Sequence, residues 1–264
     1  MRALGGLIAV CAAAAPAGAG AVDPNPCLTP EVAQLRCPDF VMRKPYGLQS
    51  DRIRGRTLLR AGNSLDSVGQ GPAELHGVRT GGSYYMRARQ RIYRRDGGRR
   101  GVDTGARLYF KYAHLSRNWW KFLFAAKFEL WRIDGQGRKT RKVRRGPKIS
   151  YCLRDFRRTR RMPGSPRRRV YPACSTNERA RRVTLGTSVG WSDVYPPSYP
   201  EQWIDVTGLR GCFAYVHTAD PLNGVYESNE ENNSAEVIVR LPFRRGRQRC
   251  TGGAREGHSH DEEY

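Results

Sequence analysis

Most of this chain divides into short runs in which polar and apolar residues alternate, separated by glycine, proline or Asp-Gly turns. A period of two places successive side chains on opposite faces of a strand, whereas a helix needs a period of 3.6. Lys127-Phe128-Glu129-Leu130 is one such run. Asp96-Gly97-Gly98 and Asp134-Gly135-Gln136-Gly137 suit hairpin turns, because glycine adopts a positive φ at little cost. The pattern predicts an all-β, antiparallel sandwich.

Strands are expected at residues 57–60, 83–93, 107–112, 125–133, 149–153, 202–206, 212–218 and 235–241. The only plausible helical stretch is residues 29–35, where Pro30 suits a first turn.

The first residues have the layout of a secretory signal peptide. Met1-Arg2 is a short positive start, residues 3–15 are apolar, and the small-x-small sites Ala17-Gly18-Ala19 and Ala19-Gly20-Ala21 follow. Pro16 makes a buried helix the weaker interpretation, and the run is too short to anchor the chain in a bilayer. We therefore expect residues 1–21 to be removed from a secreted or cell-surface protein with no transmembrane segment.

Removing the signal peptide leaves six cysteines: Cys27, Cys37, Cys152, Cys174, Cys212 and Cys250. An even number in an exported chain predicts a disulfide framework, although six cysteines allow fifteen pairings. Cys152 and Cys174 flank most of a long loop and could tie its base together. None of the usual zinc-site spacings occurs.

The net charge of +23 is concentrated in one part of the chain. Residues 138–182 contain 18 lysines and arginines but only two carboxylates, and they include a long basic loop at 154–182. One interpretation is a solvated loop in an arginine-rich protein. The other is a surface for an anionic polymer such as an acidic polysaccharide or teichoic acid. The candidate anion-binding residues are Arg157, Arg158, Arg160, Arg161, Arg167, Arg168 and Arg169. Aromatic residues are not interleaved with them, so specific nucleic-acid recognition is not expected.

We expect three segments after the signal peptide: an N-terminal extension at 22–55, one sandwich domain at 56–243 and a polar tail at 244–264. The tail contains His258 and His260, which could contact a metal, but the acidic residues beside them indicate a solvated end.

Several motifs in consistent order resemble the lysyl oxidase family, in its bacterial-type secreted form. Residues 148–155 resemble its Lys-x-x-Phe-Cys-Leu-x-Asp motif, and residues 186–206 its Trp-Ser-Asp-Val-Tyr and Gln-Trp-Ile-Asp-Val segments. Residues 220–233 are similar to its Asp-Pro…Glu-x-x-x-x-Asn-Asn ending, and residues 69–75 to its early strand pair. The resemblance covers residues 56–243 and implies a β-sandwich.

The resemblance also implies an activity, the oxidative deamination of primary amines with copper and a lysine tyrosylquinone. Lys148 matches the lysine of that quinone and Tyr195 matches the tyrosine. A quinone carbonyl forms a Schiff base with an amine, and a base then removes the α-proton. Asp193 could be that base, although an ordinary loop carboxylate is the simpler interpretation.

The copper site is where this chain departs from the family. Aligning on Phe128-Glu129-Leu130 places the family's three histidine ligands at Arg117, Trp119 and Lys121. Arg and Lys cations cannot ligate Cu(II) at neutral pH, and they repel a dication. Among the histidines of this chain, only His114 lies close in sequence to these positions, and it would be a single histidine ligand.

We therefore expect a non-catalytic lysyl-oxidase-like domain in which Lys148 and Tyr195 stay unreacted, no metal site forms and an arginine-rich loop binds an anionic partner. The alternative is an active copper- and quinone-dependent oxidase of protein lysines or other primary amines, with a non-standard metal site. A third interpretation keeps only the sandwich, because residues 208–233 also resemble immunoglobulin-like adhesion modules.

Overall fold

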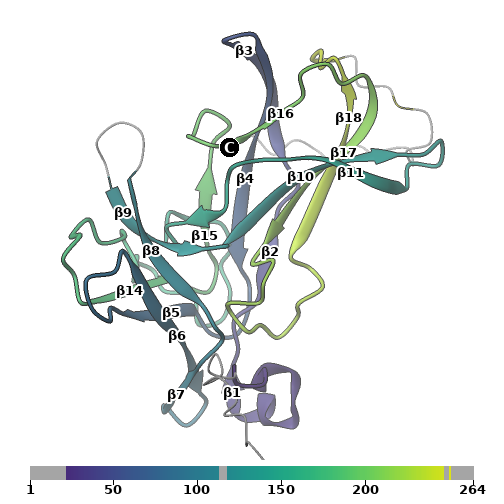
Figure 1. Ribbon diagram of the computed structural model, residues 1–264. Helices are drawn as coiled ribbons and strands as arrows, with labels where there is room; N and C mark the ends of the chain where they lie inside the picture. Colours follow the sequence, from purple (N-terminus) through teal and green to yellow (C-terminus); the bar gives the residue numbers. More distant parts are fainter. Residues whose placement is uncertain (1–21, 113–117, 247–249, 251–264) are drawn as a thin grey trace, which may run out of the picture.

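A computed structural model describes residues 22–112, 118–246 and 250 of the chain. Several predicted features lie outside the described residues: the expected signal peptide, Arg117 at an expected ligand position, the histidines His114, His258 and His260, and nearly all of the expected polar tail. The described part is almost entirely antiparallel β-structure, as the alternating pattern predicts. Its strands form three sheets. The long strand β4 (Arg56–Ser67) belongs to one of them and runs between the other two sheets (Figure 1).

The largest sheet has eight strands, with the central order β12-β9-β8-β6-β5-β14, while β1 and β7 also pair with β6. Its strands are β1 (Leu35–Arg36), β5 (Ala73–Val78), β6 (Tyr85–Arg94), β7 (Arg99–Val102), β8 (Arg107–Tyr112), β9 (Asn118–Leu123), β12 (Ser150–Tyr151) and β14 (Arg182–Thr187). Residues of β6 are buried and exposed in turn, so one side of this sheet faces the core and the other faces solvent.

The second sheet has the order β11-β10-β17-β18 and the third is built around β4. The second contains β10 (Ala126–Ile133), β11 (Lys139–Arg145), β17 (Gly211–Ala219) and β18 (Ser234–Leu241). The third adds β2 (Phe40–Met42), β3 (Tyr46–Ile53), β13 (Arg157–Arg158), β15 (Trp191–Tyr195) and β16 (Trp203–Asp205) to β4. A large core cluster joins the sheets, and Trp120, Phe122, Phe128 and Phe213 are among its fully or nearly fully buried side chains.

All eight expected strand regions contain strands, and both Asp-Gly segments form hairpin turns. The expected helical stretch forms a 3₁₀ helix, η2 (Pro30–Gln34), capped by the Thr29 hydroxyl; η1 (Pro26–Leu28) is a second short 3₁₀ helix. The strands outside the expected set are β1, β2, β3, β5, β7, β9, β11, β13, β14 and β15. The edge strand β11 shows why, because almost every one of its side chains is charged and exposed, which leaves no apolar alternation to detect.

Six cysteines form three disulfides, Cys27–Cys37, Cys152–Cys174 and Cys212–Cys250. The expected disulfide framework is therefore present, and the Cys152–Cys174 bond closes the base of the basic loop. Within the described ranges, no helix has the length and apolar character needed to cross a bilayer.

Candidate functional site

Lys148 and Tyr195 meet in the interior although they come from different parts of the chain. Lys148 lies just before β12, which belongs to the eight-stranded sheet, and Tyr195 ends β15, which pairs with β4. The Lys148 Nζ lies 4.3 Å from the centroid of the Tyr195 ring. Both side chains are buried, Lys148 completely. The structure thus brings together the two residues that the family resemblance singled out.

Two further tyrosines complete an aromatic enclosure around the Lys148 amine. Tyr151 stacks on Tyr195 with ring centroids 4.6 Å apart, and Tyr199 meets Tyr195 edge-on at 4.9 Å. The Lys148 Nζ is 4.3 Å from the Tyr199 ring centroid and 5.4 Å from that of Tyr151. Among the described residues, this amine has no hydrogen-bond partner. An amine with no polar partner in such surroundings favours its neutral form.

A hydrogen-bonded asparagine connects the two sheets at this site. Asn63 on β4 donates to the Tyr151 hydroxyl and accepts from Gln202 Nε2 at 2.9 Å. All three residues are fully buried. The contacts fix the Tyr151 ring, which in turn stacks on Tyr195.

A second lysine lies beside the first. Lys121 on β9 is buried, and its Nζ is 5.9 Å from the Tyr199 ring centroid. Burial, reinforced by the positive charge of Lys111, lowers the pKa of Lys121 to about 8, so it is mostly protonated at pH 7. Burial and then the charge of Lys121 lower the pKa of Lys148 well below 10.5. The site contains one charged amine beside one that is driven towards neutrality.

Asp193 is a fully buried strand residue of β15 that contacts Tyr195 directly, so the interpretation of it as an ordinary loop carboxylate is wrong. The Tyr195 hydroxyl donates to Asp193 Oδ2 at 2.8 Å and accepts from the Cys152 N–H at 3.1 Å. Burial raises the pKa of Asp193 to about 7, although the Tyr195 hydrogen bond and Arg154 oppose the shift. Burial and the Asp193 charge raise the pKa of Tyr195 well above 10. Tyr195 is therefore a neutral phenol oriented by a carboxyl group, and this contact was not expected from the sequence.

Two of the three positions that the family resemblance aligns with copper ligands are described, and their side chains do not suit copper. Trp119 and Lys121 lie on the same face of β9, with the Lys121 Nζ 5.7 Å from the Trp119 ring centroid. An indole offers no lone pair to a metal, and a protonated amine repels one. No group of three His, Cys, Asp or Glu side chains in the described ranges could hold a metal ion.

The two described histidines belong elsewhere. His76 contacts Glu74 on β5. His217 on β17 is fully buried, with its ring centroid 3.7 Å from that of Phe128, and burial lowers its pKa to about 3. Such a histidine is a neutral ring of the core, in a different sheet from β9.

The seven candidate anion-binding arginines lie on the loop that the Cys152–Cys174 disulfide closes. All except the half-buried Arg158 are exposed. The buried Asp155 fixes the loop by accepting hydrogen bonds from the Val170 N–H at 2.8 Å and the Ser188 N–H at 2.7 Å. The Trp191 indole donates to the Pro166 carbonyl at 3.0 Å. The charged side chains thus extend from a backbone with defined contacts, which suits a binding surface.

Sequence reasoning missed Tyr151, Tyr199 and the buried state of Lys121. Tyr151 had a signal, because it takes the place of the phenylalanine in the family's Lys-x-x-Phe-Cys-Leu motif. Tyr199 lies between β15 and β16, in a proline-rich segment whose position only the folded chain reveals.

These features define a class of protein. Its members are antiparallel β-sandwiches with a buried lysine–tyrosine pair and loops closed by disulfides. The lysyl oxidase family model matches residues 110–247, which is more than half of the chain. The chain therefore belongs to the lysyl oxidase family. Copper dependence is a property of the family as a whole and is not shown for this chain. No curated protein matches it significantly.

Proposed function

We propose that this protein is a secreted, non-catalytic member of the lysyl oxidase family that binds an anionic extracellular partner. The observation that carries the first part is the buried ammonium of Lys121, a residue that the family resemblance aligns with a copper ligand. A positive charge there opposes binding of a dication, and no described side chain supplies a replacement set of ligands. Secretion is supported by the three disulfides, which are typical of oxidising compartments.

The Tyr195 phenol remains unreacted in this proposal. Conversion of a tyrosine to a quinone is an oxidation, and in this family it depends on the copper site. Without that site, Lys148 and Tyr195 pack as an amine against an aromatic ring, which their burial and the Tyr151 stacking support. Their role is then to fill the core between the sheets.

An active amine oxidase is the second candidate, and one observation favours it. The Lys148 amine lies close to the Tyr195 ring, as formation of a lysine–tyrosine quinone requires. This second candidate needs a metal site built from ligands other than the three histidines of the family.

Peptide mapping separates the two candidates. We expect protein expressed in copper-supplemented medium to yield, after disulfide reduction and trypsin digestion, Lys148 and Tyr195 in separate peptides of unmodified mass. Trypsin cleaves after a free Lys148, whereas a cross-linked lysine resists cleavage and joins the two peptides. A Tyr195→Phe variant, which cannot form the quinone, provides the baseline for the digest and for a redox-cycling stain.

Stoichiometric copper together with a joined peptide or a stain signal above that of the Tyr195→Phe variant would establish the oxidase instead.

The second part of the proposal rests on the exposed arginines of the basic loop. Guanidinium groups present paired N–H donors that match carboxylate, sulfate and phosphate oxygens. Their concentration on one loop of a protein with a charge of +23 favours binding of a polyanion.

Removing that charge should abolish retention on a heparin-like resin. The seven-arginine variant replaces Arg157, Arg158, Arg160, Arg161, Arg167, Arg168 and Arg169 with serine. We expect this variant to elute at or below about 0.15 M salt. At that ionic strength the Debye length is roughly 8 Å, so the exposed charges that remain elsewhere on the protein are largely screened from the resin. Circular dichroism should show an unchanged β-spectrum, and retention equal to that of the wild type would contradict the assignment to this loop.

A further inference from the structure

The solvent-facing side of the eight-stranded sheet carries a row of arginines separate from the seven candidate anion-binding arginines, and it includes Arg182 at the C-terminal end of the basic loop. The strand register places Arg107 opposite Arg87, Arg87 opposite Val78, and Val78 opposite Arg182. Residues in register on neighbouring strands point to the same face. This row therefore crosses four strands, β8, β6, β5 and β14, with three guanidinium groups on one side of the sheet.

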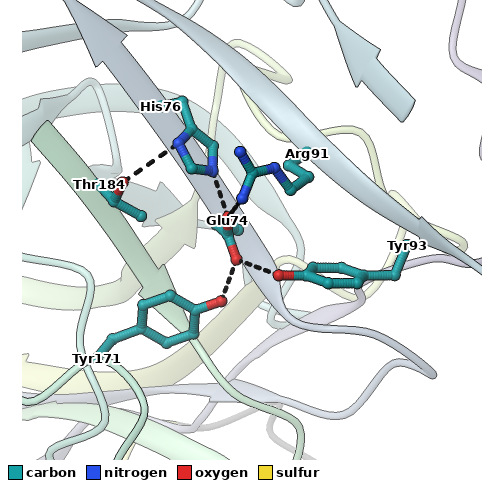
Figure 2. A network of polar contacts seen from close by, with 6 residues as sticks. All are labelled: Glu74, His76, Arg91, Tyr93, Tyr171 and Thr184. Atoms are coloured by element: carbon teal, nitrogen blue, oxygen red, sulfur yellow. Dashed lines mark hydrogen bonds and ion pairs between the residues drawn. The ribbon is translucent and has the colours of Figure 1, made fainter. Parts of the chain in front are cut away.

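A second row lies beside the first on β6, β5 and β14, displaced by two residues on each of these three strands. Arg89 lies opposite His76, and His76 lies opposite Thr184. The Thr184 hydroxyl is 3.2 Å from His76 Nδ1, and this contact is visible in Figure 2. Arg89 and Thr184 are exposed, as are the three arginines of the first row. Together Arg87, Arg89, Arg107, Arg182, His76 and Thr184 form what we call the arginine face.

The carboxylate next to the arginine face is already occupied. Glu74 is buried and contacts His76, Arg91, Tyr93 and Tyr171, as Figure 2 shows. Four neighbours therefore share its single charge, and it does not pair with the exposed arginines of either row.

Among the described acidic residues, Asp103 makes an ion pair with the face, to Arg87 at 2.9 Å. The pair neutralises one of four arginines. The face keeps a net positive charge after both carboxylates are considered.

The spacing of these charges suits an extended chain of anions rather than a small ligand. Neighbouring strands lie about 4.8 Å apart, and every second residue along a strand is about 6.7 Å further on. The face is thus a lattice of cationic groups with approximately these repeats. A polymer with regularly spaced anionic groups could contact several of them at once, and each further contact would add to the affinity.

The surroundings of the arginines favour a sugar polymer among the polyanions. Val78 is 46% exposed between Arg87 and Arg182, and Tyr85 is 51% exposed at the end of the face. Apolar surface beside charge can be covered by a sugar ring, whereas a polyphosphate has nothing to place there. Single-stranded nucleic acid binds to several aromatic platforms, but here Tyr85 and Tyr109 lie together at one edge, stacked at 6.2 Å.

We propose that the arginine face is a docking surface for an acidic polysaccharide. This inference rests on the proposed function, because it specifies the anionic partner and extends its binding surface from the basic loop onto the sheet, so that retention needs both parts. Tyr171, at the C-terminal side of the basic loop, donates to Glu74 beside the face, so loop and face are neighbours.

A matched pair of triple variants of the full mature chain tests the proposal. The face variant carries Arg89→Ser, Arg107→Ser and Arg182→Ser. The control variant removes the same charge from the exposed edge strand β11 with Arg141→Ser, Arg144→Ser and Arg145→Ser. The probe is a heparin oligosaccharide, titrated at 0.15 M salt. We expect Kd to rise at least about tenfold for the face variant and less than about threefold for the control, with a shallower salt dependence for the face variant alone.

Each other outcome overturns part of the argument in a distinguishable way. Equal weakening in both triple variants would mean that net charge, and not the arginine face, determines binding. Weakening only in the seven-arginine variant would overturn the face but leave the proposed anion-binding function intact. Wild-type affinity in all three variants would overturn both. Tighter binding of polyphosphate or of an oligothymidylate than of heparin would overturn the choice of a polysaccharide.

Discussion

Replacing Lys148 with methionine is expected to stabilise the protein by about 1–3 kcal/mol at pH 7, the usual cost of a buried polar group without a partner. Methionine fills nearly the same volume and packs well against aromatic rings. The Lys148→Met variant removes an amine that has no hydrogen-bond partner among the described residues and that lies near the Lys121 charge. Most core substitutions destabilise a protein, so the sign of the effect is itself informative. Urea unfolding followed by tryptophan fluorescence measures it.

The advantage of methionine should depend on pH in one direction. The pKa of Lys148 is lowered well below its unfolded-state value of 10.5, mainly by burial. Between the folded-state pKa and 10.5 the unfolded chain binds the proton and the native protein does not, so the stability of the wild type rises with pH. The difference between the Lys148→Met variant and the wild type should therefore be largest at low pH and shrink as pH approaches 10.5.

A lysine on the surface provides the control. Lys139 is exposed and pairs with Glu236 at 2.6 Å, so Lys139→Met should change stability by no more than about 0.5 kcal/mol. If Lys148→Met instead destabilised the protein, the amine would have a partner that it needs, as the cross-linked quinone of an active oxidase would provide. The stability measurement therefore bears on function as well as on packing.

The fold was most predictable where polar and apolar residues alternate over a long run. β6 shows the matching alternation of exposed and buried residues, and both β6 and β10 were expected from the sequence. β11 and β15 were not, for opposite reasons: β11 is exposed on nearly all sides and β15 is buried on nearly all. Neither environment produces alternation, so their place in the sheets depends on partners distant in the chain.

The site was predictable only in part, and only through the family resemblance. Lys148 and Tyr195 are 47 positions apart, and no periodicity relates them. The enclosure around the amine needs Tyr151 from one sheet and Tyr199 from a loop. The charge that lowers the pKa of Lys148 comes from Lys121 on another strand. Such a microenvironment is created by tertiary packing, and local sequence contains no signal for it.

Replacing Glu74 with glutamine is expected to destabilise the protein by about 2 kcal/mol at pH 7. The Tyr93 hydroxyl donates to its carboxylate at 2.7 Å and Arg91 at 2.9 Å, and Tyr171 and His76 contact it as well (Figure 2). A glutamine side chain has almost the same shape, but it is uncharged and one of its two oxygens becomes an NH₂ donor that faces other donors. The contact to Tyr171 should weaken with it, and so should the attachment of the basic loop to the sheet.

The stability difference between Glu74→Gln and the wild type should disappear in acid. Burial alone would raise the pKa of Glu74, but the hydrogen bonds from His76, Tyr171 and Tyr93 outweigh it and lower the pKa from 4.5 to about 2. The stabilisation from the ionised group is complete above pH 4.5 and is lost as the pH falls towards 2, because the native protein must then take up a proton. Denaturant unfolding at pH 7, 4 and 2.5 follows this loss.

An exposed carboxylate separates the network from general charge effects. Glu236 pairs with Lys139 on the surface, and Glu236→Gln should lower stability by less than about 0.5 kcal/mol at every pH. Equal losses in Glu236→Gln and Glu74→Gln would mean that any lost negative charge destabilises so basic a protein. A loss confined to Glu74→Gln, together with weaker heparin binding, would instead connect the buried network to the binding surface. Glu74 would then act as the structural anchor between the basic loop and the arginine face.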